Sequence, residues 1–593
     1  MQEISDAAGQ QIIALAQRLK AFKSFRLQAQ PTSETGDDHA HTIRLRGPDG
    51  SESFEILTLR QRDKLLLTAD ESACAIIGDF NGDENYTLRI YTVTKSGVRL
   101  AHLESPISPR VYAFGTGLLW IRRDAARRPY KALWWDRNCE HPELLFEEID
   151  RTRRLSLRSV DDDIAILASK GADTINHRII TSGDAIIPTC HLSTQDIPDG
   201  DLMVWRGDII VLDRAQGQVR ADGDDPLTAT APADFITEHL QRAGDEIAVV
   251  GRYRGHQAFW LPAQGPAALW TAPPAGIMLP SIDPATKRQA FLVSSPVHEP
   301  QVVFPSENGE VPAISTGRAV DRCLTASSDD GAPIPITIFL PPTPGPCPLV
   351  VHVYGAYGIS LEGPFDPFTD DLLARGIAVA YCHVRGGGEN GPTWHQQATG
   401  TRRHQSIADL LACLALFHNH PAIIADRIAL VAASAGGFTA AAACLRQPTW
   451  VRGLQLVHPF IDPVTALLDP GSNLTTTDWA EFGNPRADPR VKNYLEQLSP
   501  AATVRSLDPH SCPLPRAWIR TAEQDARVDS AAVKQFCELY RAAAISTDAD
   551  HVVYRATTGG HVEGQSFEQA HEENLLAHAW LLDLLDSPCI QAI

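Results

Sequence analysis

The stretch that decides the fold is Arg427 to Phe438, which reads RIALVAASAGGF. Its apolar part, Ile428 to Ala433, has the composition of a β-strand, and an alanine-rich segment that favours a helix, Thr439 to Leu445, follows. Between them the chain turns in Ser-Ala-Gly-Gly, so the pattern predicts the strand, tight turn and helix of a nucleophile elbow. Such a turn strains the backbone of its serine, Ser434, and exposes the hydroxyl above a parallel sheet.

The usual elbow pattern is G-x-S-x-G, and Ala432 replaces the first glycine here. The other small residues that the turn requires are present at Ala435, Gly436 and Gly437. An ordinary strand-to-helix turn of an α/β protein would produce the same stretch, so the residues downstream must decide between the two interpretations.

Length and composition indicate a globular protein of several domains. The 593 residues exceed the ~250 to 300 residues that one hydrophobic core supports. The formal charge of −20 argues against nucleic-acid binding, which requires a basic surface. Eleven cysteines without a C-x-x-C pair predict reduced thiols. We therefore expect no metal and no cofactor.

The N-terminal segment carries acids at Glu3 and Asp6 and lacks the basic start and apolar core of a secretory signal. The sequence contains no run of about 18 apolar residues that could cross a membrane. These features predict a cytoplasmic protein without a membrane partner. They leave open whether it is a monomer or a homodimer.

The chain divides into three predicted regions. Residues 1–30 form a helical segment that packs on the catalytic domain, because apolar residues recur at helical spacing over residues 4–22. Residues 41–314 are short β-rich runs between polar turns, which is typical of a barrel, sandwich or propeller. At ~40 to 45 residues per blade this length gives six or seven blades. The choice of a propeller, which we expect to be seven-bladed, rests partly on the family resemblance given below.

Residues 316–593 alternate strands with helices, which predicts a doubly wound, mostly parallel sheet of the α/β-hydrolase class. The predicted strands are Pro335–Phe339, Leu349–Val353, Ile377–Val384, Ile428–Ala433, Gly453–Val457, Arg516–Thr521 and Val552–Ala556. Catalytic groups are expected at their carboxyl ends.

A serine nucleophile requires an imidazole base and a carboxylate that orients it, in the chain order Ser, acid, His in this fold. Asp525 follows one predicted strand and His561, preceded by two glycines, follows the next. Glu523 and Asp529 are competing acids, but the first is close to the strand and the second falls in the following helix. Position therefore favours Asp525.

The tetrahedral intermediate of acyl transfer also requires hydrogen-bond donors for its oxyanion. The backbone N–H of Ala435, directly after the nucleophile, supplies one. A second donor is expected from the loop after the strand Leu349–Val353, which reads YGAYG from Tyr354 to Gly358.

Six motifs together resemble the prolyl oligopeptidase family, and within it the oligopeptidase B branch. They are VYGAYG, YCHVRGGGENGPTWH at Tyr381 to His395, AASAGG, LTTTDWAEFGNP at Leu474 to Pro485, DARV at Asp525 to Val528, and GGH at Gly559 to His561. Residues 112–180 also resemble the propeller of that branch. The resemblance implies a serine peptidase whose propeller acts as a lid that admits short peptides.

When the residues of this sequence are matched to the motifs of the family, the resemblance implies that Ser434 is the nucleophile, Asp525 the orienting acid and His561 the base. It makes Tyr354 an oxyanion donor and Arg527 a clamp on a substrate carbonyl. Packed-aromatic and surface-ion-pair roles remain the alternatives for Tyr354 and Arg527, respectively.

Oligopeptidase B recognises basic side chains through two acidic pairs, and this sequence keeps one acid of each. Asp478 is retained where Ala480 replaces its partner, and Glu362 is retained where Pro364 replaces its partner. A preference for cleavage after Arg or Lys is therefore expected in weakened form. The alternatives are a peptidase, isopeptidase or esterase with one dedicated substrate, and a non-catalytic propeller scaffold that binds peptides.

Overall fold

The computed structural model describes most of the chain. The described residues are 26–31, 41–46, 53–59, 64–67, 73–79, 85–94, 97–160, 164–171, 174–182, 185–191, 200–205, 208–221, 227–243, 246–266, 268–282, 289–304, 320–468, 475–561 and 567–586. The predicted helix at 4–22 lies outside them. Residues 26–30, which the sequence assigned to the helical segment, belong to strand β1 (Arg26–Pro31).

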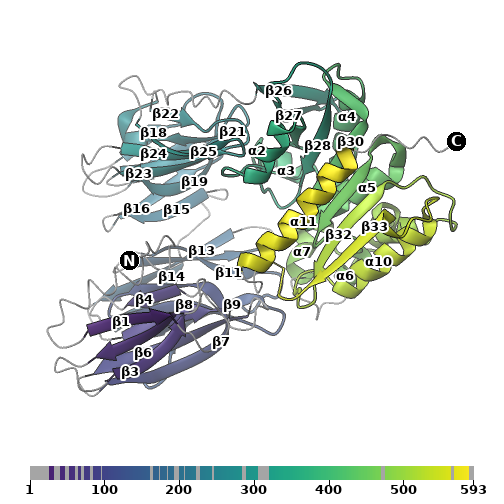
Figure 1. Cartoon of the computed structure of the whole chain (residues 1–593). Coiled ribbons are helices and arrows are strands. Elements are labelled where there is room, and N and C mark those ends of the chain that lie inside the picture. Colours follow the sequence, from purple (N-terminus) through teal and green to yellow (C-terminus); the bar gives the residue numbers. More distant parts are fainter. Residues whose placement is uncertain are drawn as a thin grey trace. The chain divides into compact units, whose positions relative to one another are not determined.

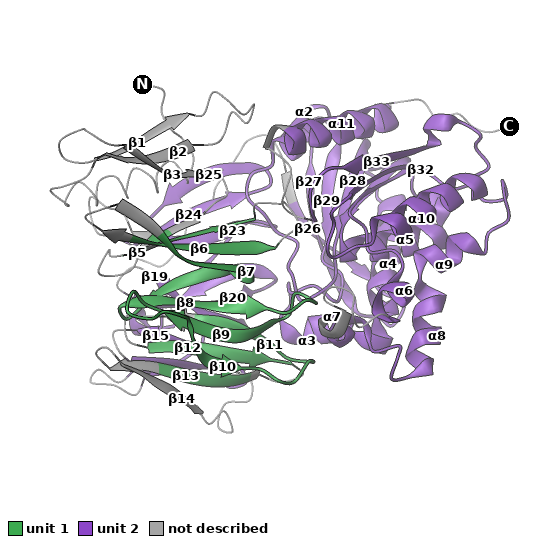
Figure 2. Cartoon of the chain, turned by 90° about the horizontal axis from the view of Figure 1, so that it is seen from below, with its two compact units in different colours: residues 1–194, 562–564 green, residues 195–561, 565–593 purple. Residues whose placement is uncertain are grey.

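The chain forms two compact units (Figure 2). One comprises residues 1–194 and 562–564, and the other comprises residues 195–561 and 565–593. This division does not coincide with the change in sheet type. The sheets that contain only antiparallel pairs end with β25 (His298–Val303), and the sheet that contains the parallel pairs begins with β26 (Val320–Ser327). The predicted domain boundary near residue 315 stays a prediction.

The part of the chain before residue 304 folds as antiparallel sheets in which each strand pairs with the next. The first three sheets are β1 with β2 (His41–Arg46) and β3 (Ser53–Leu59); then β4 (Lys64–Leu67), β5 (Ala73–Gly78), β6 (Tyr86–Thr94), β7 (Gly97–Phe114), β8 (Gly117–Arg123), β9 (Pro129–Trp135) and β10 (Glu143–Glu147); then β11 (Arg154–Val160), β12 (Ile164–Lys170), β13 (Thr174–Ser182) and β14 (Ala185–His191).

Three further sheets continue this order. They are β15 (Gly200–Trp205), β16 (Asp208–Asp213), β17 (Gln218–Ala221) and β18 (Leu227–Thr230); then β19 (Phe235–Ala243), β20 (Glu246–Tyr253), β21 (His256–Trp260) and β22 (Leu269–Thr271); then β23 (Ile277–Ile282), β24 (Gln289–Ser295) and β25. Four-stranded antiparallel sheets of consecutive strands are the blades of β-propellers.

The long strand β7 changes partner at Ile107, which pairs with both neighbours: residues before it pair with β6, and residues after it pair with β8. The seven-stranded sheet therefore consists of two four-stranded halves that share β7. The number of blades stays a prediction.

From residue 320 onward the described strands form one eight-stranded sheet in the order β26-β27-β29-β28-β30-β31-β32-β33 (Figure 1). Its further strands are β27 (Pro333–Leu340), β28 (Cys347–Val353), β29 (Ala378–Cys382), β30 (Ile423–Ala433), β31 (Gly453–Val457), β32 (Arg516–Ala522) and β33 (Val552–Thr557). The pairs of β27 are antiparallel, and all other pairs are parallel. This arrangement confirms the predicted α/β-hydrolase sheet.

Helices cover both faces of this sheet. One face packs against α4 (His404–His418), α5 (Ala435–Arg446), α8 (Pro489–Leu498), α9 (Pro500–Arg505) and α10 (Ser530–Ala543), and the other against α2 (Pro367–Ala374) and α11 (Phe567–Asp586). The described residues also form the helices α3 (Pro392–Gln396), α6 (Pro463–Leu468) and α7 (Thr475–Phe482). No helix among the described residues has the length and apolarity needed to span a membrane.

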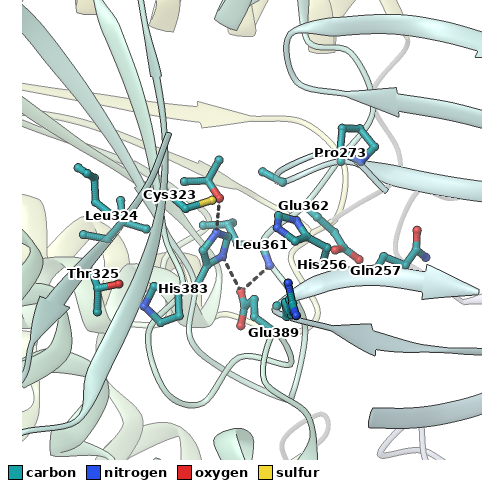
Figure 3. Close-up of a pocket in the computed structure, with 17 residues that line it drawn as sticks. His256, Gln257, Pro273, Cys323, Leu324, Thr325, Leu361, Glu362, His383 and Glu389 are labelled. Carbon is teal, nitrogen blue, oxygen red and sulfur yellow. Dashed lines mark hydrogen bonds and ion pairs between the residues drawn. The ribbon is translucent and has the colours of Figure 1, made fainter. Parts of the chain in front are cut away.

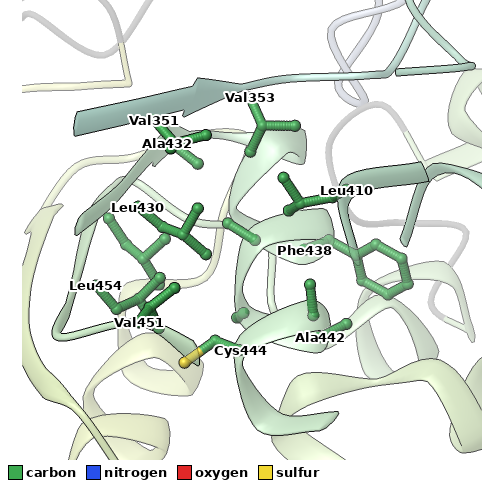
Figure 4. Close-up of a cluster of buried hydrophobic side chains, with 14 of the residues drawn as sticks. Val351, Val353, Leu410, Leu430, Ala432, Phe438, Ala442, Cys444, Val451 and Leu454 are labelled. Carbon is green, nitrogen blue, oxygen red and sulfur yellow. The ribbon is translucent and has the colours of Figure 1, made fainter. Parts of the chain in front are cut away.

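The larger core lies between the sheet and α5. Leu430 and Ala432 of β30 lie next to Val351 and Val353 of the neighbouring strand β28 on the same face of the sheet, and Phe438 of α5 packs against them (Figure 4). All five side chains are buried. This packing holds α5 against the sheet and so fixes the turn between β30 and α5.

Candidate active site

Five polar side chains lie directly beyond the carboxyl ends of parallel strands. Tyr354 follows β28, Ser434 follows β30, His458 follows β31, Asp525 lies shortly after β32, and His561 shortly after β33. In open α/β sheets the carboxyl ends form the crevice in which ligands bind.

Ser434 occupies the turn between β30 and α5 with φ 51° and ψ −126°. A non-glycine residue with this backbone costs on the order of 1 to 3 kcal/mol, so the surroundings must hold it. Its N–H donates to Val457 O at 2.9 Å, and its carbonyl accepts from the N–H of Phe460 at 2.9 Å. These hydrogen bonds tie the strained turn to the neighbouring strand β31 and to the segment after it.

Close packing explains the small residues around Ser434. A Cβ on Gly436 would lie 2.8 Å from Val353 O, and one on Gly437 would lie 2.5 Å from Pro459 Cβ. Ala432, in contrast, belongs to a strand, and its methyl group is buried in the core. The departure from the usual glycine therefore fits the structure without a clash.

Ser434, His561 and Asp525 form a hydrogen-bonded series. Ser434 Oγ lies 3.0 Å from His561 Nε2, and His561 Nδ1 lies 2.7 Å from Asp525 Oδ2. With the hydrogen on Nδ1, the imidazole donates to the carboxylate and can accept the proton of the serine hydroxyl. This is the geometry that serine hydrolases require.

Asp525 is held as a carboxylate. Its Oδ1 accepts the backbone N–H groups of Arg527 and Val528, both at 2.9 Å. Burial raises the pKa of this group, but the nearby imidazoles of His458 and His561 and the Arg527 N–H outweigh it and hold the pKa far below its ordinary value. The acid is thus ionised at neutral pH.

The two competing acids have other environments. Glu523 is exposed, and Asp529 is the N-cap of α10, where its side chain accepts the N–H of Ala531. Among the described residues, neither of them forms a hydrogen bond or ion pair with His561. The geometry therefore agrees with the choice of Asp525 from its position.

Two groups beside Ser434 can donate hydrogen bonds to an oxyanion. Ala435 is the first residue of α5, where backbone N–H groups lack an intrahelical acceptor. The half-buried Tyr354 packs against the core, and its phenol lies beside Ser434. Burial raises the pKa of Tyr354, so its hydroxyl stays protonated at neutral pH.

Arg527 is exposed and lies close to this site. Its charge lowers the pKa of Tyr354, although burial of the phenol outweighs the effect. Its backbone N–H is bound to Asp525, so the residue is anchored at the site.

Helix α7 carries the predicted acid Asp478, which is half-buried, while Ala480 is exposed. Asp478 lies near Tyr357, whose pKa is raised first by burial and then by the charge of Asp478. Tyr357 follows Tyr354 in the loop after β28. The acid is therefore close to the loop that carries the predicted oxyanion donor.

Glu362, the other predicted acid, is already paired. Its carboxylate accepts two hydrogen bonds from the Arg252 guanidinium at 2.6 and 3.0 Å. Burial raises the pKa of Glu362, and the pairing with Arg252 opposes that rise. Glu362 lines a pocket of about 110 Å³ together with His256, His383 and Glu389 (Figure 3).

The lining of that pocket includes neither Ser434 nor His561. Arg252 already neutralises the Glu362 carboxylate, which argues against recognition of a basic substrate side chain by Glu362, and that role stays a prediction. A long-range ion pair of this kind leaves no local signal in the sequence.

Sequence reasoning missed two residues. His458 lies 3.4 Å, Nδ1 to Oδ2, from Asp525, and its position directly after a predicted strand was the available signal. Glu481 is buried and accepts hydrogen bonds from the Tyr357 N–H at 2.9 Å and Arg403 Nη1 at 3.0 Å, and it contacts His395 Nε2 at 2.7 Å. It holds the loop after β28 against α7.

Comparisons with known proteins agree with this geometry. The sequence pattern of the prolyl oligopeptidase family matches residues 365–587. The human protein named prolyl endopeptidase-like is 34% identical over 274 residues, which are 44% of this chain and 36% of that protein. This chain thus spans about a third of the length of that relative. Protease 2 of Moraxella lacunata is 24% identical over 559 residues, covering 88% of this chain and 79% of its own length.

Solved structures extend the likeness to almost the whole chain. Oligopeptidase B from Leishmania major has a TM-score of 0.73 at 17% identity and covers 98% of this chain and 90% of its own. Oligopeptidase B from Trypanosoma brucei, with covalently bound antipain, has a TM-score of 0.73 at 19% identity, with coverage of 98% and 91%. At such identities the likeness concerns the fold. Residues 365–587 of this chain are thus similar to the prolyl oligopeptidase family, and the chain as a whole resembles oligopeptidase B in its fold.

Proposed function

We propose that this protein is a serine oligopeptidase that hydrolyses short peptides through an acyl-enzyme. The observation that carries the proposal is the series Ser434 Oγ, His561 Nε2, His561 Nδ1 and Asp525 Oδ2, with separations of 3.0 and 2.7 Å. A surface serine beside a histidine would not also occupy a strained strand-to-helix turn at the carboxyl end of a parallel sheet.

In this proposal Ser434 Oγ attacks the scissile carbonyl while His561 Nε2 accepts its proton. Asp525 keeps the hydrogen of His561 on Nδ1 and stabilises the imidazolium. The Ala435 N–H and the Tyr354 hydroxyl donate to the oxyanion. His561 then passes the proton to the leaving amine, and a water molecule repeats the sequence to release the acyl group.

Two further side chains bind the substrate. Arg527 contacts a backbone carbonyl of the peptide, and Asp478 pairs with an Arg or Lys side chain. A charge-assisted hydrogen bond contributes roughly 1.5 to 3 kcal/mol, or about ten- to a hundred-fold discrimination. Because Ala480 and the paired Glu362 remove further acids, we expect the lower part of that range.

The antiparallel sheets of residues 41–314 complete the proposal as a seven-bladed propeller that limits the size of substrates. Folded domains cannot enter a lidded site, whereas extended peptides can. The consecutive antiparallel strands and the fold likeness to oligopeptidase B support this part of the proposal.

The second candidate is a peptidase, isopeptidase or esterase with one dedicated substrate. The observation that favours it is the loss of free acids, since Glu362 is neutralised by Arg252 and Ala480 offers no charge. In that case the same triad acts, but Arg or Lys confers no advantage.

A library of short peptides, with cleavage sites read by mass spectrometry, tests the proposal. Wild type should cleave peptides, with enrichment of Arg and Lys before the cut, and Ser434→Ala should cleave none. Cleavage without basic enrichment selects the second candidate. If neither peptides nor ester substrates are turned over, the enzyme proposal fails and the scaffold alternative replaces it.

A further inference from the structure

His458 is a second histidine at Asp525 for which the proposed mechanism has no use. Its Nδ1 lies 3.4 Å from Asp525 Oδ2, and its ring lies 5.4 Å from the ring of His561, centroid to centroid. The residue is 8% exposed, and among the described residues its Nδ1 has no hydrogen-bond partner of good geometry. A buried ring nitrogen that lies near a carboxylate without a hydrogen bond of good geometry is available to bind a metal ion.

The backbone holds this side chain in place. His458 has φ 48°, in the left-handed region that non-glycine residues rarely occupy. Its N–H donates to Arg520 O at 2.7 Å, on the neighbouring strand β32 that leads to Asp525. The imidazole is therefore fixed relative to the carboxylate.

Ligand atoms of His458, Asp525 and His561 all lie within 4.8 Å of one another. Zn²⁺ binds imidazole nitrogen and carboxylate oxygen at about 2.0 to 2.2 Å in tetrahedral geometry, which places neighbouring ligand atoms about 3.4 Å apart. The separation between His458 Nδ1 and Asp525 Oδ2 already has this value. The separation between His561 Nδ1 and Asp525 Oδ2 is 2.7 Å and must widen by about 0.7 Å, since an ion replaces the hydrogen between them.

We propose that His458, Asp525 and His561 form an inhibitory Zn²⁺ site inside the active site. The ion binds His458 Nδ1, Asp525 and His561 Nδ1. As it binds, the hydrogen on His561 Nδ1 is released as a proton and Nε2 takes up one proton from solvent, so the imidazole changes tautomer and stays neutral. A neutral imidazole with a metal on Nδ1 carries its hydrogen on Nε2. That nitrogen then cannot accept the proton of Ser434, so hydrolysis stops.

His458 is the residue that creates the site. His561 and Asp525 alone offer two ligands, and the hydrogen bond between them competes with binding of the ion. His458 adds a third ligand on a fixed backbone, so that three side chains bind the ion together and its affinity rises. Two histidines and one carboxylate leave a fourth position for water, as in other three-ligand zinc sites.

The inhibition rests on the proposed function, but the binding of Zn²⁺ does not. The experiments therefore measure zinc binding and inhibition of hydrolysis separately. Calorimetry with ZnCl₂ on the metal-free Ser434→Ala protein measures binding without turnover. We expect one site, and His458→Asn in that background should weaken it by at least about tenfold, because even the loss of an outer partner of a zinc ligand costs this much. Asparagine tolerates positive φ, so this change keeps the backbone.

His510→Asn is the matched control, since His510 also has positive φ, 53°, and is exposed outside the site. It should bind zinc as Ser434→Ala does. In the active enzyme, ZnCl₂ should inhibit hydrolysis reversibly with EDTA, and His458→Asn should raise the half-inhibitory concentration at least about tenfold. Asp525→Asn in the Ser434→Ala background supplies a second ligand deletion if His458→Asn does not fold.

Equal zinc affinity of Ser434→Ala with and without His458→Asn, or no binding at all, overturns the inference. If both ligand deletions weaken binding while wild type hydrolyses no substrate, the metal site stands and the proposed function falls. If the enzyme is active and zinc inhibits it equally with and without His458, the inference falls alone.

Discussion

Replacing Asp525 by asparagine should almost abolish activity, for a reason visible in its hydrogen bonds. Oδ1 accepts two backbone N–H groups, from Arg527 and Val528, while Oδ2 faces His561 Nδ1. In Asp525→Asn the amide oxygen must stay with the two N–H donors. The NH₂ group then faces His561 and donates to Nδ1, which moves the imidazole hydrogen to Nε2 and prevents proton uptake from Ser434.

The opposite amide orientation would restore the active tautomer, but it takes the acceptor from the partly buried Val528 N–H and from the exposed Arg527 N–H. Water can replace the acceptor at Arg527, so the active form is disfavoured by roughly 1 to 3 kcal/mol, mainly at Val528. At 1.4 kcal/mol per tenfold this alone lowers kcat about 5- to 150-fold, and loss of the charge that stabilises the imidazolium lowers it further, toward the ~10⁴ known for another triad. Steady-state hydrolysis of a fluorogenic peptide measures this fall.

The matched control is Glu523→Gln, which changes an exposed acid two residues earlier and should leave kcat unchanged. Retention of wild-type activity by Asp525→Asn, or loss of activity in Glu523→Gln instead, refutes the reasoning. Stability gives a second readout. Because the folded pKa of Asp525 is lowered, its carboxylate stabilises the fold above the ordinary pKa near 4, and this contribution is lost as pH falls. The stability difference between wild type and Asp525→Asn should shrink in acid.

Four other outcomes follow from the site. Tyr354→Phe should lower kcat by roughly 10² with a smaller change in KM, and a change in KM alone would assign the hydroxyl to substrate binding. Asp478→Asn should lower kcat/KM for Arg substrates about tenfold and spare uncharged ones; an equal effect on both removes the basic pocket. Glu362→Gln should cost about 1 to 3 kcal/mol in denaturant unfolding without altering the preference for Arg, and an altered preference would restore its predicted role. Peptides should be digested while native folded proteins are spared, and rapid digestion of folded domains contradicts the lid.

The α/β-hydrolase part was predictable because its signals are local. Strand Gly453–Val457 agrees with the predicted bounds, since an apolar run between turns defines it. Strand β30 begins at Ile423, earlier than predicted, because Asp426 and Arg427 interrupt the apolar run.

The antiparallel part was harder to predict from its sequence. Pro106 and Pro109 are typical of strand ends, yet both lie within β7. They fall where the strand changes partner, between residues paired with β6 and residues paired with β8. A change of partner depends on contacts between sheets, which a local pattern does not contain.

The site residues likewise divide into those with a local sequence signal and those that depend on contacts between distant residues. Ser434, Asp525 and His561 were found because each follows a strand in the required order. The pairing of Glu362 with Arg252 joins residues 110 positions apart, so no local pattern could reveal that the acid was occupied. His458 was within reach, because it also follows a predicted strand, but a mechanism with a single histidine gave no reason to choose it.

The most direct test of the account is covalent labelling by a fluorophosphonate, with the modified residue mapped by peptide mass spectrometry. An active triad phosphonylates its own serine, so the account predicts one adduct, on Ser434, formed rapidly by wild type. The adduct should be absent in Ser434→Ala and slowed by orders of magnitude in Asp525→Asn. No adduct on the folded wild-type protein, or an adduct on another serine that persists in Ser434→Ala, would contradict it.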